Sequence, residues 1–460
     1  MILTAAILAS ALGFIDGTVV SIALPAMRSS LEATLAQAQW FSNAYMLFLS
    51  ALILAGGALG DRFGLACVFS LGIGFFILAS LACALATSPE FMIVARAAKG
   101  MGAALMVPGS LALISRAYPK AERGRAIGIW AAASALTTAL GPIMGGLVLT
   151  FGGPEFWRWI FAINLPLGLL ALWILRRAVQ RDPAQEHAPV DWLGAGLATL
   201  GLGGVAYGLT DLDALWASGA GTIALLAFII HEARTRHPMM PLRLFADARF
   251  SAANVATFLM YAALGAMFFY LPMTVITAWD VTPIEAAAAF APLSVFISSL
   301  STRAGQMSDR LGPERVIAAG AGLVALAYAL IALTAGLGAF WAATFPAMAL
   351  AGLGMAFVVA PLSSAVMASV EDAQTGAASG VNNAISRMAS LLSIAAFGSL
   401  AAFAYTASGG ALSFGAEGAD EAHRAAVTVG FSAVAWVASA LAAAAAATMM
   451  LTRPKAAAAD

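Results

Sequence analysis

Four ionisable side chains fall inside long apolar stretches of the sequence: Asp16, Arg96, Lys99 and Arg387. A charge at the centre of a bilayer costs at least about 2.5–3.5 kcal/mol, so a residue of this kind is a candidate for function. Burial favours the protonated Asp16 carboxyl, whereas a nearby guanidinium favours the carboxylate. A carboxyl balanced between these effects can gain and lose a proton as its access to water changes. We therefore predict that Asp16 couples protons with Arg96 as its partner; a permanently ionised structural pair is the alternative.

The bases beyond this pair have predicted roles of their own. Lys99, one helical turn after Arg96, is predicted to face a substrate cavity, and the alternative is a side chain that extends to the membrane interface. Arg387 lies one turn after Asn383 among polar neighbours, which favours a water-lined cavity over simple helix packing. Three bases against one acid predict a neutral, amphipathic or anionic substrate rather than a multivalent organic cation.

Two aromatic residues are candidates for the apolar wall of the same cavity. Trp40 and Tyr45 both lie on the second apolar stretch. Aromatic residues near helix ends more often sit in belts at the membrane interface. Both interpretations follow from the sequence, and we carry the cavity role forward as the prediction.

The composition requires a membrane environment for these residues. Of 460 residues, 62% are hydrophobic and 10% are charged, with a mean hydropathy of +0.90. Soluble domains carry about 25% charged residues. The apolar runs are about 20 residues long, which is the length that a helix needs to cross the hydrocarbon. The sequence predicts an all-α polytopic protein with fourteen spans, at 2–26, 38–59, 66–87, 90–113, 125–150, 157–177, 192–210, 219–231, 250–278, 283–304, 315–336, 339–361, 376–405 and 426–451.

The basic residues predict an orientation. If both termini are cytoplasmic, seventeen of the 23 Lys and Arg residues fall in inner loops or the tail, and three fall in outer loops. This asymmetry is the positive-inside pattern, and it favours a bacterial cytoplasmic (inner) membrane protein with both termini inside. The net charge of zero gives no field that would attract nucleic acid. Cys67 and Cys83 lie too far apart on one predicted helix for a disulfide.

A repeated loop motif divides the chain into two halves. Asp61-Arg62 stands in a glycine-rich octet after the second span, and Asp309-Arg310 stands in a similar octet after the tenth. Each octet occupies the second loop of a six-span block. We predict that both pairs take part in conformational gating; an ordinary short loop is the alternative. The predicted parts are 1–178 and 249–460, each a six-helix bundle, with two inserted helices in 179–248.

A second small-residue cluster lies on the fifth span. Its members Gly141, Pro142, Gly145 and Gly146 permit close helix approach and a bend in the backbone. A helix that is merely packed would use small residues too. We predict a gating role for this cluster.

These motifs resemble those of the Major Facilitator Superfamily, in its fourteen-helix drug:proton antiporter branch. The residues that carry the resemblance are the octet at 57–64, Arg96–Gly102, the cluster at 141–146, Ile15–Pro25 and Trp157–Gly168. Leu65, Ala66 and Cys67 depart from it, since Arg or Lys is usual there. The resemblance implies two six-helix bundles plus two inserted helices, proton-coupled export of small amphipathic or drug-like molecules by alternating access, and Asp16 as the coupling residue.

Other function classes find less support in the sequence. The four histidines show no metal-ligand spacing, and no phosphate-binding loop ending in Lys-Ser or Lys-Thr is present. We therefore expect no metal, no cofactor and no enzymatic activity. A channel and a carrier of a lipid, glycolipid or organic anion without multidrug activity are the alternatives. The expected partners are a small-molecule substrate, protons and membrane lipids, with the chain acting as a monomer.

Overall fold

The computed structural model describes residues 1–178, 190–371, 374–416, 418 and 420–452, and within them it contains helices and no β-strand. Arg181, His187, Arg453 and Lys455, which entered the sequence predictions, lie outside these residues. The first block of the chain forms α1 (Ile2–Ser30), α2 (Leu35–Phe63), α3 (Leu65–Ala84), α4 (Pro89–Ala117), α5 (Lys120–Gly152), η1 (Pro154–Arg158), α6 (Trp159–Ala162) and α7 (Asn164–Ala178).

The remaining elements follow in the same way. The middle of the chain forms α8 (Trp192–Thr210), η2 (Leu212–Ala214), α9 (Leu215–Arg234) and η3 (Leu242–Ala246). The last block forms α10 (Ala248–Ala278), α11 (Pro283–Ala288), α12 (Ala291–Leu311), α13 (Pro313–Thr334), η4 (Ala335–Leu337), η5 (Phe340–Thr344), α14 (Phe345–Ala368), α15 (Thr375–Ala407) and α16 (Glu421–Leu451).

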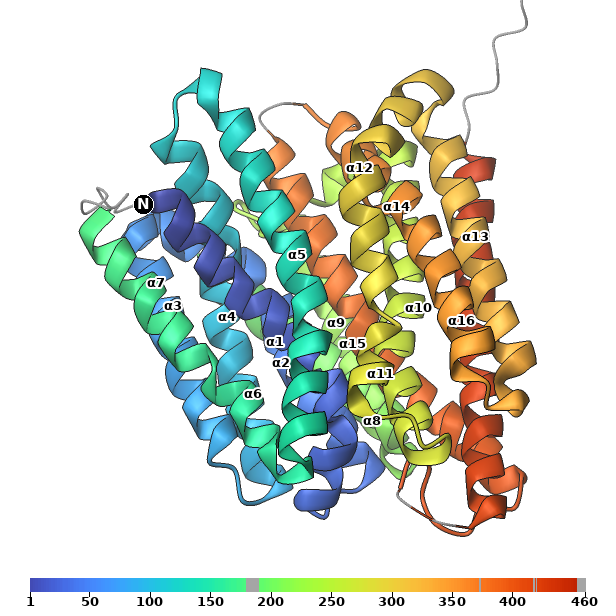
Figure 1. The fold of residues 1–460 in the computed structure, drawn as a ribbon. Helices are drawn as coiled ribbons and strands as arrows, with labels where there is room; N and C mark the ends of the chain where they lie inside the picture. The colour runs from blue at the N-terminus through green and yellow to red at the C-terminus, as the bar shows by residue number, and fades with distance from the viewer. Residues whose placement is uncertain (179–189, 372–373, 417, 419, 453–460) are drawn as a thin grey trace, which may run out of the picture.

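The predicted fourteen-span architecture is confirmed. Thirteen helical segments of the described chain are long and apolar enough to cross a membrane. The helix α5, of 33 residues, is the fourteenth; it packs along α1, and its apolar part is Leu136–Gly152. Two spans each contain two consecutive α-helices, α6 with α7 and α11 with α12. All of the helices stand side by side in one bundle (Figure 1).

The helix of the eighth span extends a few residues beyond the predicted span at each end. The sequence indicated 219–231, whereas α9 begins at Leu215 and ends at Arg234. Gly221 permits close packing within this helix pair, because a Cβ there would meet the backbone of α8 at Gly201, Gly204 and Val205.

The helices form two groups with a pair between them. Helices α1–α7 pack mainly on one another, as do α10–α16. Helix α8 contacts both groups, through α2 and α15, and α9 pairs with α8. Residues 179–189, the start of the predicted linker, lie outside the described residues. Figure 1 shows α8 and α9 behind the junction of the two groups.

The two loop octets have the same backbone geometry. Gly64 has a φ of 92° and separates α2 from α3, and Gly312 has a φ of 85° and separates α12 from α13. A side chain rarely adopts this left-handed backbone, so each tight connection depends on glycine. In both halves, therefore, one helix passes into the next through a single residue.

Close packing of α2 on α4 depends on another glycine, and the neighbouring glycine serves as its control. A Cβ at Gly56 would overlap the carbonyl of Ala104 on α4, whereas a Cβ at Gly57 would meet nothing within 4 Å. We expect Gly56→Ala to destabilise the protein by on the order of 1–3 kcal/mol through overpacking. Gly57→Ala is expected to be neutral or to stabilise by up to about 1 kcal/mol, since alanine favours helix. Thermal unfolding in detergent measures both; equal melting temperatures would contradict the packing argument.

Candidate functional site

Asp16 lies in a sealed cluster of charges between α1 and α4. Arg96 Nη1 donates to Asp16 Oδ2 at 2.5 Å, and Lys99 Nζ donates to Asp16 Oδ1. The three side chains are between 0% and 2% exposed. Residues three apart on a helix share one face, so Arg96 and Lys99 approach α1 together. Arg96 Nε also donates to the Phe41 carbonyl of α2 at 2.6 Å.

Aromatic rings complete the walls of this cluster, which we call the Asp16 triad (Asp16, Arg96 and Lys99). The Arg96 guanidinium lies 4.5 Å from the centre of the Tyr45 ring, and the Lys99 ammonium lies 4.8 Å from the Phe161 ring. Such faces attract cations when water is excluded. The triad carries a net charge of +1 when all three groups are ionised.

The structure places Lys99 elsewhere than predicted. Neither the predicted substrate cavity nor the membrane interface contains it, because its ammonium is buried against Asp16. Trp40 also lies outside the residues that line the two cavities described below, and its ring packs against Tyr207 of α8 at 6.3 Å. An unpaired lysine would cost more in this position than one bonded to a carboxylate, which explains why Lys99 turns to α1.

A cavity of about 810 Å³ lies between the two groups of helices. It reaches the end of the molecule that carries Asp61, here called the Asp61 end. Tyr45, Asn383 and Arg387, three of the predicted cavity residues, line it. One face of α15 forms a wall, since Gly376, Ser379, Gly380, Asn383 and Arg387 recur at helical spacing.

A second cavity of about 330 Å³ lies deeper and shares Arg387 and Phe14 with the first. Its wall combines hydroxyl groups with aromatic and aliphatic side chains. Gly17 and Thr18 belong to this wall, one and two residues after Asp16. The same stretch of α1 therefore lines the deep cavity and contains Asp16, the candidate for proton binding.

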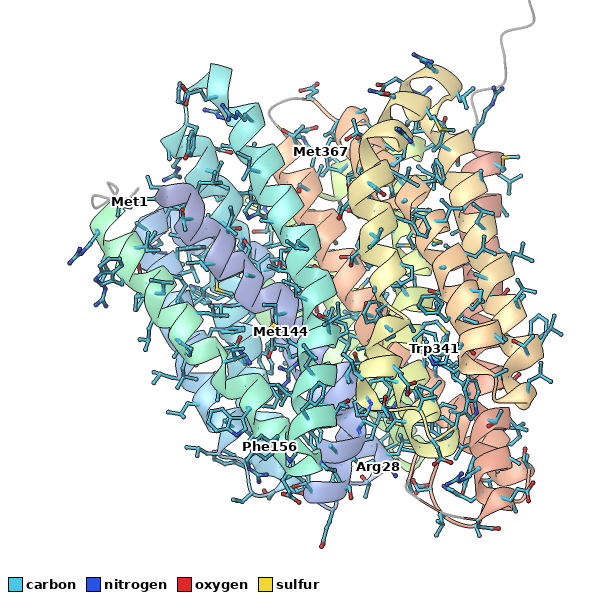
Figure 2. The ribbon with its side chains drawn as sticks, viewed as in Figure 1. Met1, Arg28, Met144, Phe156, Trp341 and Met367 are labelled. Atoms are coloured by element: carbon cyan, nitrogen blue, oxygen red, sulfur yellow. The ribbon has the colours of Figure 1, made fainter. Side chains whose placement is uncertain are left out.

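The opposite end of the molecule, here called the Arg28 end, is closed by contacts between the halves. Arg28 Nη1 donates to the Phe414 carbonyl at 2.5 Å and Nη2 donates to Ser413 Oγ at 2.6 Å. Gln39 Nε2 of α2 donates to Tyr270 Oη at 3.1 Å and to the Ile394 carbonyl. Figure 2 shows Arg28 at the end opposite Met1.

The predicted gating cluster of α5 lies at two close helix contacts, one within its own half and one between the halves. A Cβ at Gly141 would overlap Thr18 Oγ1, and one at Gly145 would crowd Val19 of α1. A Cβ at Gly146 would lie 2.8 Å from Ile284 Cα of α11, in the other half. Pro142 is buried between them. The cluster thus brings α5 close to α1 on one side and to α11 on the other.

The two Asp-Arg pairs, predicted as loop residues, lie in the last turns of α2 and α12 at the Asp61 end. Arg116 Nη2 donates to Asp61 at 3.1 Å, with both side chains about half exposed. Exposed pairs of this kind contribute about 0–1 kcal/mol, so the pair is weak enough to open and close. The Arg62 guanidinium lies 5.3 Å from the Phe63 ring. Asp309 and Arg310 are exposed at the matching position in the other half.

Sequence reasoning missed a polar cluster beside the cavity mouth. Asp191, the N-cap of α8, contacts His231 Nε2 of α9 at 2.9 Å, and the backbone N–H of Met240 donates to Glu232 at 2.8 Å. Burial raises the pKa of Asp191, but bonds from the Gly194 N–H and His231 outweigh burial and hold the pKa below its usual value. The cluster fixes the chain that leaves α9. Its members come from the start of α8, the end of α9 and the segment after α9, so no local motif in the sequence indicated it.

Comparisons with known proteins agree with this architecture. The model of the Major Facilitator Superfamily matches residues 6–394. Rv1250 of Mycobacterium tuberculosis, described as an uncharacterised MFS-type transporter, is 33% identical over 85% of this chain and 67% of its own. The tetracenomycin C resistance and export protein of Streptomyces glaucescens is 30% identical over 84% of this chain and 73% of its own.

The fold has a counterpart among solved structures as well. The crystal structure of a D-xylose-proton symporter superposes with a TM-score of 0.69, at 16% identity, over 98% of this chain and 97% of that one. This likeness concerns the fold alone. Together with the family match over most of the sequence, it leads to one conclusion: the chain belongs to the Major Facilitator Superfamily.

Proposed function

We propose that this protein is a proton-coupled antiporter that exports small amphipathic or drug-like molecules by alternating access. The observation that carries the proposal is the asymmetry of the junction between the halves. A cavity of about 810 Å³ reaches the Asp61 end, while Arg28 and Gln39 bridge the halves at the other end. Binding at such a junction and rocking of the halves about it is how carriers of this architecture work.

The basic residues of the loops indicate the orientation of the protein in the membrane, and the two bundles are its moving parts. Basic residues concentrate at the Asp61 end, so this end lies in the cytoplasm of a bacterium, with both termini inside. In this orientation, the larger cavity of the structure is open toward the cytoplasm, which makes this the inward-facing state. Residues 1–178 and 249–460 rock as two bundles, and 179–248 accompany them. One chain holds the whole cavity, which supports action as a monomer.

The Asp16 triad supplies the coupling. In the inward-facing state the carboxylate is ionised and bonded to both cations. When the halves rock and water reaches Asp16 from outside, a proton binds the carboxyl, and Arg96 and Lys99 lose their counter-charge. The change displaces α4 relative to α1, and Gly17 and Thr18 carry the displacement to the deep cavity. Asp61, Arg62, Asp309 and Arg310 open and close the inner end.

The export direction has support from the relatives as well. One relative is named for tetracenomycin C resistance and export. A cavity that holds both hydroxyl and aromatic groups suits amphipathic molecules of drug size.

The test uses purified protein in liposomes that contain a pH-sensitive dye. Naphthamide, naphthylmethylammonium and naphthoate, which share one ring system and differ in charge, are added in turn. Proton movement that depends on both protein and substrate is the expected result. Substrate flux without proton movement would instead indicate a uniporter or a lipid carrier, and a proton ionophore added last confirms that the dye responds.

A further inference from the structure

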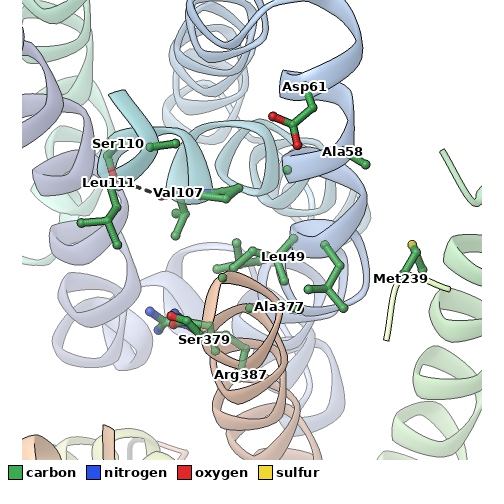
Figure 3. A pocket seen from close by; sticks show the side chains of 18 of the residues that line it. Leu49, Ala58, Asp61, Val107, Ser110, Leu111, Met239, Ala377, Ser379 and Arg387 are labelled. Atoms are coloured by element: carbon green, nitrogen blue, oxygen red, sulfur yellow. Dashed lines mark hydrogen bonds between the residues drawn. The ribbon is translucent and has the colours of Figure 1, made fainter. Parts of the chain in front are cut away.

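Arg387 is a charged residue without a charged or hydrogen-bonding partner in the described part of the chain. It lies on α15, where both cavities meet, and lines each of them. No described carboxylate lies within 4 Å of it, and no described hydrogen bond involves its guanidinium; Tyr45 lines the larger cavity with it, and Tyr261 lines the deep one. Figure 3 shows Arg387 and Ser379 on the side of the cavity away from Asp61.

Of the other charges near the cavities, Arg236 is exposed where it lines the larger one, and the rest contact a group of opposite charge. Arg96 and Lys99 share Asp16 and are sealed from the cavity behind Tyr45. The two acids that line the larger cavity lie at its mouth, where Asp61 pairs with Arg116 and Asp191 with His231. Among the residues that line the deep cavity, Arg387 is the one that carries a charge. The binding space therefore presents an uncompensated positive charge.

The walls around Arg387 indicate what the rest of a ligand looks like. Phe14, Tyr261, Phe268 and Phe269 offer aromatic surfaces. Hydroxyl groups stand on the same walls, contributed by Thr18, Ser21, Ser42, Ser134, Thr138, Ser294 and Ser390. A volume of about 330 Å³ suits one compact ring system rather than the two acyl chains of a phospholipid.

We propose that Arg387 anchors the carboxylate of a compact amphipathic organic anion, whose apolar ring system occupies the deep cavity. The inference rests on the proposed function and adds the substrate class to it. A guanidinium matches a carboxylate with two parallel hydrogen bonds. The anion also neutralises Arg387, so that the site loses its uncompensated charge before the halves close around it.

The first test measures binding of naphthoate and naphthamide at neutral pH by calorimetry, to wild type, Arg387→Gln, Arg387→Lys and Arg303→Gln. Arg303 is an exposed arginine outside both cavities and controls for the loss of one positive charge. Hydrogen bonds between charged groups predict that wild type binds naphthoate about 10- to 100-fold more tightly than naphthamide. Arg387→Gln is expected to remove this preference, Arg387→Lys to retain part of it and Arg303→Gln to retain all of it.

Two results would overturn the proposal. One is equal affinity of wild type for the two ligands. The other is an unchanged naphthoate preference in Arg387→Gln. Because naphthamide binding reports on the folded cavity in each variant, a misfolded Arg387→Gln would lose both ligands, and Arg387→Lys then decides by its retained or lost preference.

Liposome transport separates this inference from the proposed function. Proton movement driven by naphthylmethylammonium or naphthamide, with naphthoate inert, would refute the anion site and leave antiport intact. Arg387-dependent naphthoate binding without proton movement for any of the three compounds would leave the anion site intact and refute antiport.

Discussion

Asp16→Asn is expected to lower the melting temperature sharply and to abolish proton-coupled transport. The substitution leaves the Arg96 guanidinium and the Lys99 ammonium, both fully buried, facing each other without their carboxylate. Removing one partner of a buried ion pair costs about 3–5 kcal/mol, because a charge is left without compensation. Asparagine also cannot bind and release a proton in this range of pH. Thermal unfolding in detergent and the dye-filled liposome assay measure the two effects.

A second substitution separates folding from coupling. In Asp16→Asn/Lys99→Met one buried cation is gone, and we expect most of the melting temperature to return without proton-coupled transport. Lys99→Met alone keeps the bond between Arg96 and Asp16 and is expected to keep coupled transport. Proton movement in a stable double variant would show that protons bind elsewhere and that Asp16 is a structural partner of Arg96.

Gln39→Ala is expected to shift the protein toward the state that is open at the Arg28 end. The Gln39 side chain is 1% exposed and bonds across the halves to Tyr270 and to the carbonyls of Ile394 and Ala395. Losing a buried donor leaves its partners unsatisfied at a cost of about 1–3 kcal/mol. Since about 1.4 kcal/mol is tenfold in an equilibrium constant, the ratio of the two states changes by about 5- to 150-fold.

Spin labels measure this shift directly. Ser29 and Ser408 are exposed at the Arg28 end and belong to different halves. Both are replaced by cysteine in a background where Cys67 and Cys83 are alanine. Electron–electron distances should gain a longer component in Gln39→Ala. Gln37→Ala is the matched control, because Gln37 bonds to Thr34 and Glu90 within its own half. A distribution equal to wild type in Gln39→Ala would contradict the role assigned to this contact.

Fourteen spans and a repeated loop were predictable from the sequence because both have strong local signals. Hydrophobic length fixes a span almost independently of its neighbours. The octets at 57–64 and 305–312 contain the glycine that each tight turn requires. The limits of α9 were not predictable in the same way, since the tight packing of Gly221 on α8 depends on a neighbouring helix and not on the local sequence.

The sequence predicted which residues belong to the site better than it predicted where their side chains lie. Asp16, Arg96 and Arg387 could be selected because a charge in an apolar run is costly wherever it points. The partner of Lys99 could not be predicted, because the rotation of α4 about its own axis decides whether Lys99 faces the cavity or α1. The cluster of Asp191, His231 and Glu232 depends on where the start of α8 meets the end of α9, which spacing along the chain does not encode.

The charge of the Asp16 triad makes the proposed transport sensitive to the membrane potential. The triad holds a net charge of +1 with Asp16 ionised and +2 with Asp16 protonated. One elementary charge that crosses the membrane potential gains or loses about 2.3 kcal/mol per 100 mV. In the proposed mechanism, a proton that enters through Asp16 moves down the voltage as well as down the pH gradient. The proposed expulsion of an anion from Arg387 moves charge in the same electrical direction, so each turnover of this mechanism would draw on the voltage twice.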